Sequence, residues 1–140
     1  MQSGLRNVLL GKYQRHIMES LSPNIYVQDV KGTMQFYNKL GFEAIMSVPE
    51  NSEEPVWAMM QNGGVTLMFE SFKNIEGRLP EIQRQDGGAL LFYIKVKDVQ
   101  ALFDSLKDQV TVLQGLEKTF YGATEFTIKD CNGYVLTFAD

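Results

Sequence analysis

The sequence predicts an α+β fold made of two βαβββ modules, and three observations lead to this prediction. The C-terminal segment 123–140 alternates apolar and polar residues on both sides of Asn132-Gly133, which is the pattern of a β-hairpin. Residues 56–69 show the same pattern around a glycine turn. The two hairpins share an offset of 69 positions (133 − 64), which links Gly64 with Gly133, Leu67 with Leu136, Phe69 with Phe138 and Trp57 with Phe126. A repeat of this length indicates two similar units packed together.

The first module opens with a strand in which Ile25 and Val27 alternate with polar residues. Asp29 is then expected to cap a helix, because apolar residues recur after it at helical spacing as far as Gly41, which ends the helix. A further strand and an acidic loop lead into the hairpin. In chain order, the strand, the helix and the three further strands are predicted over 22–27, 30–40, 43–48, 56–60 and 65–69.

The second module repeats this order after a polar stretch, 73–88, which we interpret as the linker. Asp98 takes the place of Asp29 as the helix cap, again at the offset of 69 (98 − 29). At the last turn we expect type I′ geometry, with positive φ at both Asn132 and Gly133. The strand, helix, strand and closing hairpin are predicted over 90–96, 99–106, 110–113 and 123–140, so the modules span 21–72 and 89–140.

The segment 1–20 lies outside the repeat. Arg6, Lys12 and Arg15 precede any acidic residue, and the apolar cluster at 8–10 is too short for a signal peptide. We interpret this segment as an extension held loosely by the domain, or as the product of an upstream start codon with Met18 as the working start. The alternative is a short amphipathic helix that packs on the domain or on a partner subunit.

Composition limits the class of protein. A chain of 140 residues with a net charge of −4 and no basic stripe fits one globular domain, and nucleic acid is not an expected partner. No apolar run approaches the roughly 20 residues of a membrane helix, so no membrane partner is expected either. The single cysteine, Cys131, excludes an internal disulfide and fits a reducing compartment, so we expect a cytoplasmic protein.

Several short motifs occur in order along the chain, and the first of them occurs in both modules. They are the V-x-D-h start of each helix, Phe36-Tyr37 before Leu40-Gly41-Phe42, and the closing F-x-I-x-D-x-x-G-x-x-h-x-F. In this order they resemble the vicinal oxygen chelate superfamily, which includes glyoxalase I, bleomycin and fosfomycin resistance proteins, and extradiol dioxygenases. The resemblance covers Leu21 to Asp140. It implies a curved mixed sheet around a cavity, a small-molecule ligand and a homodimer.

The same resemblance implies where metal ligands stand in the metal-dependent members, with a His at the start of each module's first strand and a Glu in each last strand. These four positions are here occupied by Ser22, Met68, Leu91 and Thr137. Met and Leu do not bind hard or borderline divalent cations, and Ser and Thr are poor ligands. The single histidine, His16, lies outside the repeat. We therefore expect no metal and no other cofactor.

Strand alternation predicts which side chains face the cavity, if Ile25, Phe69 and their counterparts pack under the helices. The lining is then apolar and aromatic with a few polar groups, as in small-molecule sites. The residues expected to bind the ligand are Tyr26, Met60, Met68, Glu70, Leu91, Tyr93, Lys95 and Thr137. The simpler interpretation of Met60, Met68 and Leu91 is that they fill the space with side chains.

Glu70 and Lys95 are the sharpest candidates, because a buried charge is costly unless it is paired. Each is expected to orient the ligand, to pair with the other, or to reach solvent at the end of its strand. The acidic run Glu50, Glu53 and Glu54 forms either a negative wall for a cationic ligand or an ordinary solvated loop.

Two classes of function stay open. One is a metal-independent protein that binds and sequesters a small, partly aromatic and cationic molecule, such as an antibiotic or an aromatic metabolite. The other is a glyoxalase-type lyase, or another metabolic enzyme of the superfamily, that acts through Glu70 or Tyr93. The lack of good ligands at the four positions favours the first class, because the superfamily's chemistry usually needs a metal to polarise paired oxygens.

Overall fold

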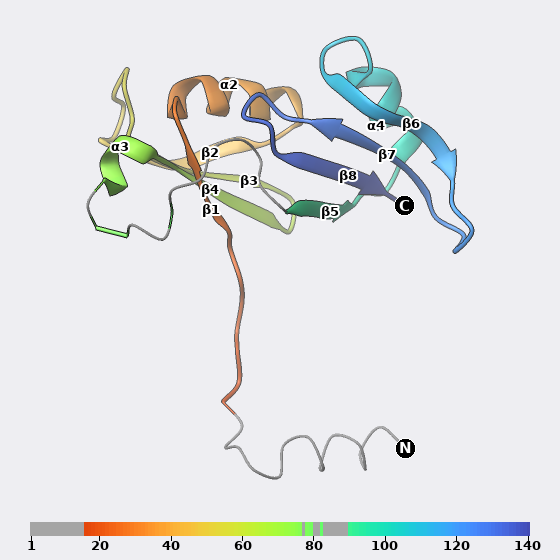
Figure 1. Ribbon diagram of the computed structural model, residues 1–140, viewed down its shortest axis with the longest axis horizontal. Coiled ribbons are helices and arrows are strands. Elements are labelled where there is room, and N and C mark those ends of the chain that lie inside the picture. The colour runs from red at the N-terminus through yellow and green to blue at the C-terminus, as the bar shows by residue number, and fades with distance from the viewer. Residues whose placement is uncertain (1–15, 77, 80–81, 83–89) are drawn as a thin grey trace.

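The computed structural model describes residues 16–76, 78, 79, 82 and 90–140, and within them two similar modules follow one another (Figure 1). The first module contains β1 (Asn24–Val27), α2 (Val30–Lys39), β2 (Glu43–Val48), β3 (Trp57–Asn62), β4 (Val65–Ser71) and the short α3 (Phe72–Ile75). The second contains β5 (Leu91–Lys95), α4 (Val99–Leu106), β6 (Thr111–Lys118), β7 (Thr124–Lys129) and β8 (Val135–Ala139).

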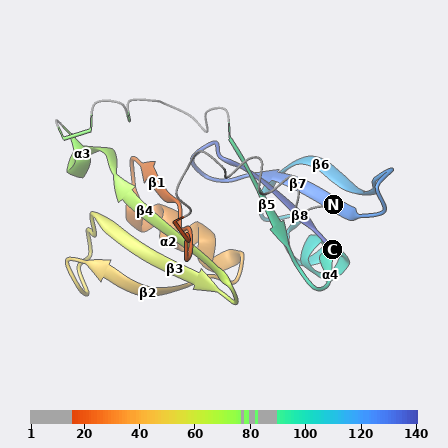
Figure 2. The same ribbon diagram turned by 90° about the horizontal axis from the view of Figure 1, so that it is seen from below.

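Each module folds into a four-stranded mixed sheet with the same topology. The strand orders are β1-β4-β3-β2 and β5-β8-β7-β6, and the first strand of each module pairs in parallel with the last. Figure 2 shows the two sheets side by side. The register repeats with the predicted offset, because Ile25 pairs with Phe69 and Ile94 pairs with Phe138. The predicted α+β fold of two βαβββ modules is therefore confirmed.

The helix caps also agree with the sequence prediction. The Asp29 carboxylate accepts a hydrogen bond of 3.0 Å from the backbone N–H of Gly32, and Asp98 accepts one of 3.1 Å from Ala101. Each cap satisfies an amide at the helix N-terminus that has no partner inside the helix. The helices then cover one face of each sheet, and those faces share one continuous hydrophobic core.

The turn at the last hairpin differs from the predicted type I′ geometry. Gly133 has a φ of 86°, whereas Asn132 does not have a positive φ. Oδ1 of Asp130 accepts hydrogen bonds of 2.8 Å from the backbone N–H groups of Asn132 and Tyr134. An Asp at the start of a turn competes in this way for backbone donors. It thereby supports a longer loop than the two-residue turn between Asn62 and Val65 in the first module.

Because the two hairpin loops differ in length, the third strands of the two modules are related by an offset one residue shorter than the 69 of the repeat. Ala58 pairs with Phe69, and its counterpart Phe126 pairs with Phe138, so this strand has an offset of 68 (126 − 58). A shift by one residue moves every side chain of a strand to the other face. Met60 therefore lies in the core, fully buried and opposite Leu67, and its predicted position in the cavity lining is wrong.

Hydrogen bonds between described residues of β1, α2 and the last turn join the two modules. The Tyr37 hydroxyl of α2 donates to Oδ2 of Asp130 at 2.6 Å, with both residues buried. Nδ2 of Asn132 donates to Oγ1 of Thr33 at 2.9 Å, and the Tyr134 hydroxyl donates to the backbone oxygen of Tyr26 at 3.0 Å. Burial, followed by the nearby Asp130 carboxylate, raises the pKa of Tyr37 well above its ordinary value.

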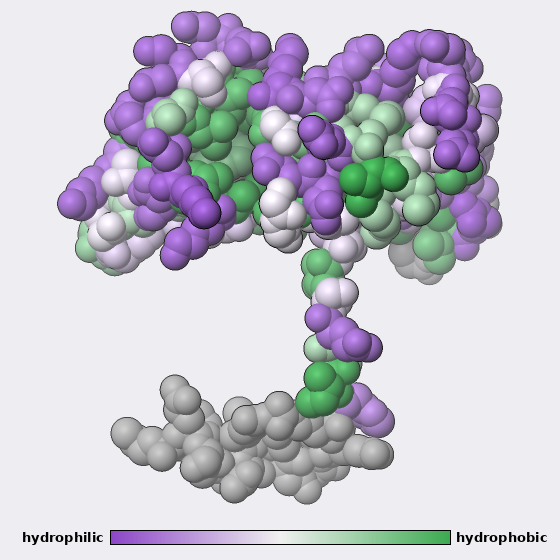
Figure 3. Space-filling view, turned by 180° about the vertical axis from the view of Figure 1, so that it is seen from behind, coloured by the Kyte–Doolittle hydropathy of each residue, from purple (hydrophilic) through white to green (hydrophobic). Residues whose placement is uncertain are grey.

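Residues 16–21, before β1, stand away from both modules (Figures 1 and 3). Ile17, Met18 and Leu21 are exposed in this segment, and the remainder of the predicted extension, 1–15, lies outside the described residues. Helix α3 continues into the segment predicted as the linker, 73–88, most of which also lies outside them. Within the part of the chain that the structure describes, no helix has the length and apolar character needed to span a membrane.

Candidate functional site

The second sheet carries a hollow of about 510 Å³ on the face opposite its core-facing side chains. We call it the Glu125 hollow. Its lining residues are Leu91, Tyr93, Leu113, Gln114, Tyr121, Glu125, Thr127, Val135 and Thr137. Because successive residues of a strand point to opposite faces, the strands that bury Phe126 and Leu136 present Glu125 and Thr137 here. Three of the residues predicted to bind a ligand, Leu91, Tyr93 and Thr137, therefore lie in one place.

Two phenol groups hold the Glu125 carboxylate. The Tyr93 hydroxyl donates to Oε2 of Glu125 at 2.9 Å, and the Tyr121 hydroxyl lies 2.9 Å from both carboxylate oxygens. The hydrogen bond to Glu125 is the main cause that raises the pKa of Tyr93 to about 12. At neutral pH this phenol is therefore protonated and acts as a donor.

The charge of Glu125 has no cationic partner among the described residues. The two ion pairs found there join Lys31 to Glu53 and Arg78 to Glu70. Glu117 lies directly opposite Glu125 in the β6–β7 ladder and adds a second negative charge nearby. Like charges directly opposite in a ladder destabilise it, so a bound cation would relieve a repulsion that the fold contains.

A pair of threonines lies between the strands of this hollow. The hydroxyl groups of Thr127 and Thr137 are 2.8 Å apart, and both residues are buried. The Thr127 hydroxyl also donates a longer bond, 3.5 Å, to Oε1 of Gln114. Thr137, which stands where the resemblance implies a metal ligand, thus has its hydroxyl engaged by another side chain.

Glu70 lies outside the Glu125 hollow, and its carboxylate is held by other side chains. Its Oε1 accepts from Asn24 at 3.0 Å, and its Oε2 accepts from Asn74 at 2.9 Å and from Arg78 at 3.1 Å. Of the three alternatives for Glu70 and Lys95, their mutual pairing is not found, because Lys95 lies exposed on the other module. With both oxygens engaged and little exposed surface, Glu70 joins the end of β4 to α3.

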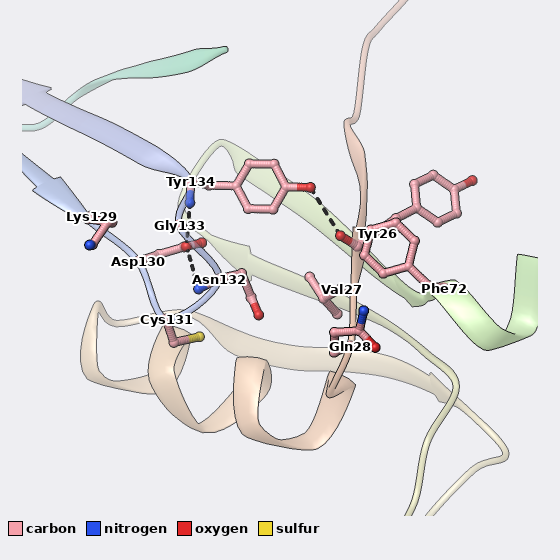
Figure 4. Close-up of a pocket in the computed structure, with 10 residues that line it drawn as sticks. All are labelled: Tyr26, Val27, Gln28, Phe72, Lys129, Asp130, Cys131, Asn132, Gly133 and Tyr134. Atoms are coloured by element: carbon pink, nitrogen blue, oxygen red, sulfur yellow. Dashed lines mark hydrogen bonds between the residues drawn. The ribbon is translucent and has the colours of Figure 1, made fainter. Parts of the chain in front are cut away.

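Tyr26 lines another hollow, of about 590 Å³, between β1 and the β7–β8 turn (Figure 4). Cys131 and Lys129 stand on the turn side of this hollow, and Phe72 lies beside Tyr26. Burial is the main cause that raises the pKa of the Cys131 thiol. A raised thiol pKa lowers the thiolate fraction at neutral pH, so the setting does not favour reactive cysteine chemistry.

The four positions where the resemblance implies metal ligands carry residues that do not fit a metal ion. Ser22 and Thr137 offer neutral hydroxyl groups, Met68 offers a thioether, and Leu91 offers no donor. The side chains that most often bind divalent cations in proteins are carboxylate, imidazole and thiolate groups. The described residues also contain no group of three or more His, Cys, Asp and Glu side chains that could hold an ion.

The polar lining residues that the sequence analysis did not single out are Gln114, Tyr121, Glu125 and Thr127. The alternation within β7 was a usable signal, because Phe126 and Ile128 are core residues and their neighbours must face the other way. The repeat offset obscured this signal, since it paired Phe126 with Trp57. Tyr121 lies in the loop after β6, and the apolar–polar alternation of a strand does not predict where a loop side chain points.

Comparisons with known proteins agree with this architecture. Residues 14–138 match the family model described as Glyoxalase/Bleomycin resistance protein/Dioxygenase superfamily. The hypothetical protein SA1046 of S. aureus is 20% identical, covering 89% of this chain and 94% of its own, with a TM-score of 0.71. A family enzyme from Burkholderia phytofirmans PsJN is 19% identical, covering 84% and 94%, with a TM-score of 0.69.

A bleomycin resistance determinant encoded on the transposon Tn5 has the same fold. It is 18% identical to this chain, covering 88% of it and 98% of its own length, with a TM-score of 0.62. At such identities the likeness concerns the fold alone. No curated protein matches the sequence.

Proposed function

Since this chain belongs to the Glyoxalase/Bleomycin resistance protein/Dioxygenase superfamily, we propose that it is a metal-independent binding protein for a small, partly aromatic cation. The observation that carries the proposal is the unpaired Glu125 carboxylate, which Tyr93 and Tyr121 hold inside the Glu125 hollow. Sequestration of an antibiotic or of an aromatic metabolite in the cytoplasm is the role that this chemistry suits.

The hollow matches such a ligand in size and in chemistry. Its volume of about 510 Å³ lies within the roughly 300–1,000 Å³ of small-molecule sites. Leu91, Leu113 and Val135 supply apolar surface, and the two tyrosine rings supply faces on which a cation or an aromatic ring can stack. The carboxylate then supplies the charge that selects a cation over a neutral molecule.

Binding is better supported than catalysis. The four metal-ligand positions offer poor donors, so the metal-assisted chemistry of the superfamily lacks its ligands here. The enzyme alternative through Glu70 or Tyr93 is also weakened. Glu70 has both oxygens engaged, and a phenol with a pKa of about 12 is a poor acid or base near neutral pH.

A homodimer is part of the proposal. Leu91, Tyr93 and Leu113 line the Glu125 hollow and are each about half exposed, at 49%, 55% and 48%, so a second copy that packs beside the hollow would close it over a ligand. Figure 3 shows apolar surface, in green, on both halves of the body. Sedimentation at twice the chain mass of 15.9 kDa is expected. Sedimentation as a monomer would count against this part.

The experiment is a thermal-shift screen of bleomycin-type antibiotics, thiol adducts and aromatic metabolites, because a ligand that binds only the folded state raises the melting temperature. For any compound that binds, Glu125→Gln should weaken the affinity at least about tenfold. Glu43→Gln, an exposed carboxylate on the other module, is the matched control and should leave it unchanged. Equal affinities in wild type and Glu125→Gln would overturn the site.

Metal analysis of the purified protein tests the other half of the proposal. We expect less than stoichiometric zinc, nickel, manganese and iron, because the superfamily's ligand positions carry Ser, Met, Leu and Thr. One tightly held ion per chain would overturn the metal-independent assignment and would revive the enzyme alternative.

A further inference from the structure

The register of the second sheet places Lys95 on the same face as Glu125. Lys95 pairs with Ala139 in the β5–β8 ladder, and Ala139 pairs with Glu125 in the β7–β8 ladder. Residues directly opposite in a ladder point to the same face of the sheet. Lys95 and Glu125 therefore stand in one row, with the small side chain of Ala139 between them. We call this row of three residues the charged row.

The alternation along β5 gives the same direction for Lys95. Leu91 and Tyr93 line the Glu125 hollow, whereas Ile94 packs against the hydrophobic core. Successive residues of a strand point to opposite faces, so Lys95 is the next residue after Tyr93 on the face of the hollow. It stands at the edge of the hollow, beyond the lining residues of its own strand.

Both ends of the charged row carry a charge without an ion pair in the described part of the chain. Lys95 is exposed, and the two ion pairs found there include neither Lys95 nor Glu125. The Glu125 carboxylate is instead held by the hydroxyl groups of Tyr93 and Tyr121. The row therefore presents a positive charge at one end and a negative charge at the other.

The two charges are close enough for one small molecule to meet both. Neighbouring strands lie about 4.8 Å apart, and only β8 separates β5 from β7, so the backbones of Lys95 and Glu125 are about 10 Å apart. The Tyr93 side chain already spans this gap, because its hydroxyl reaches Oε2 of Glu125 at 2.9 Å from the strand that carries Lys95. A ligand as short as one side chain can therefore contact both ends of the row.

A second unpaired lysine on this face is too distant from Glu125 to serve the same ligand. Lys129 lies four residues after Glu125 in β7 and pairs with Val135, which lines the hollow. At about 3.3 Å per residue, its backbone stands about 13 Å along the strand from that of Glu125. Lys129 has the same charge on the same face and lies outside the charged row, so it provides a matched control.

We propose that the ligand of the Glu125 hollow is an aromatic zwitterion in which an ammonium group and a carboxylate group lie close together, as in an aromatic α-amino acid. The ammonium group meets Glu125, the carboxylate meets Lys95, and the ring lies on the apolar surface of Leu91 and Val135. This inference rests on the proposed cation site and narrows its ligand class. Lys95 is then the residue that distinguishes a zwitterion from a simple cation.

The test is calorimetric titration of the full chain with three matched probes. They are phenylalanine, phenethylamine, which lacks the carboxylate, and 3-phenylpropanoate, which lacks the ammonium group. We expect phenylalanine to bind at least about threefold more tightly than phenethylamine, the gain of one exposed ion pair. We expect no measurable binding of 3-phenylpropanoate, because it offers Glu125 no cation.

Substitution of the lysines separates the charged row from the rest of the face. Lys95→Gln should abolish the advantage of phenylalanine and leave the affinity for phenethylamine unchanged. Lys129→Gln should change neither affinity. Both lysines are exposed, so neither substitution removes a core contact.

The outcomes distinguish this inference from the proposed cation site. If phenethylamine binds and loses affinity in Glu125→Gln, but phenylalanine binds no more tightly, the zwitterion is refuted and the cation site stands. Tighter binding of both probes to Lys95→Gln would also refute the zwitterion, because Lys95 would then compete with the ligand for Glu125. Absence of binding by either probe would overturn the zwitterion, whereas the thermal-shift screen with Glu125→Gln tests the cation site independently.

Discussion

Removal of the Tyr37 hydroxyl group tests how the two modules are held together. This group donates a hydrogen bond of 2.6 Å to Oδ2 of Asp130, and both residues are buried. In Tyr37→Phe the ring keeps its contacts with Phe42 and Phe69, so the change removes the hydrogen bond alone. Hydrogen bonds to charged groups contribute about 1.5–3 kcal/mol, so the free energy of unfolding should fall by about 2 kcal/mol.

Urea unfolding measures this loss. The fluorescence of Trp57, the single tryptophan, and circular dichroism should both report a lower midpoint with an unchanged slope. Tyr121→Phe is the control, because the Tyr121 hydroxyl contacts Glu125 at the surface, and it should cost less than about 0.5 kcal/mol. A loss below about 0.5 kcal/mol in Tyr37→Phe as well would refute the reasoning that this bond joins the modules.

The same contact predicts a dependence on pH. Burial raises the pKa of Asp130 above its ordinary value of 3.8, although hydrogen bonds from Tyr37 and from backbone amides act in the opposite direction. A carboxyl group with a higher pKa in the folded state binds more protons when folded, so its contribution to stability falls as the pH rises from 3.8 through the raised pKa. The advantage of wild type over Asp130→Asn should therefore be larger at about pH 4 than at about pH 7. An equal or smaller advantage at the lower pH would contradict this sign.

Three further substitutions test the register, the α3 contact and the last turn. Met60→Ala should lower the free energy of unfolding by about 2–5 kcal/mol, because it leaves a cavity in the core. Met59→Ala, on the opposite face of the sheet, should lower it by less than half as much. Equal losses in urea unfolding would argue against the register. Glu70→Ala leaves three donors without their acceptor, and faster proteolysis near α3 is the expected result. Gly133→Ala places a side chain at a φ of 86° and should lower the unfolding free energy by about 1–2 kcal/mol; no loss would mean that the turn rearranges.

Local chemistry made much of the fold predictable from the sequence. Asp29 and Asp98 lie at the helix starts because their carboxylates cap backbone amides, an interaction within one turn of the chain. The packing of Ile25, Phe69, Ile94 and Phe138 on the core face follows from alternation, because one face of each strand must be buried. The repeat then extended these local signals to two modules.

The sequence repeat did not predict which face of the sheet each side chain of the third strand occupies. Trp57 and Phe126 share the repeat offset, yet they point to different faces of their sheets, because the loop that Asp130 organises is longer than the two-residue turn of the first module. The length of the loop depends on side-chain hydrogen bonds that compete with the β-ladder. A sequence repeat does not reveal these bonds, so it does not predict the register that they set. Met60 was misplaced for this reason.

By itself, the sequence determined the class of fold, the doubled module, the helix caps and the poor donors at the superfamily's metal positions. These features depend on residue types and on neighbours close along the chain. Only the tertiary structure decided that Arg78, and not Lys95, meets Glu70, and that Tyr93 and Tyr121 converge on Glu125. Such partners come from different strands and loops, and their meeting depends on the twist and register of the packed sheets, which no local pattern encodes.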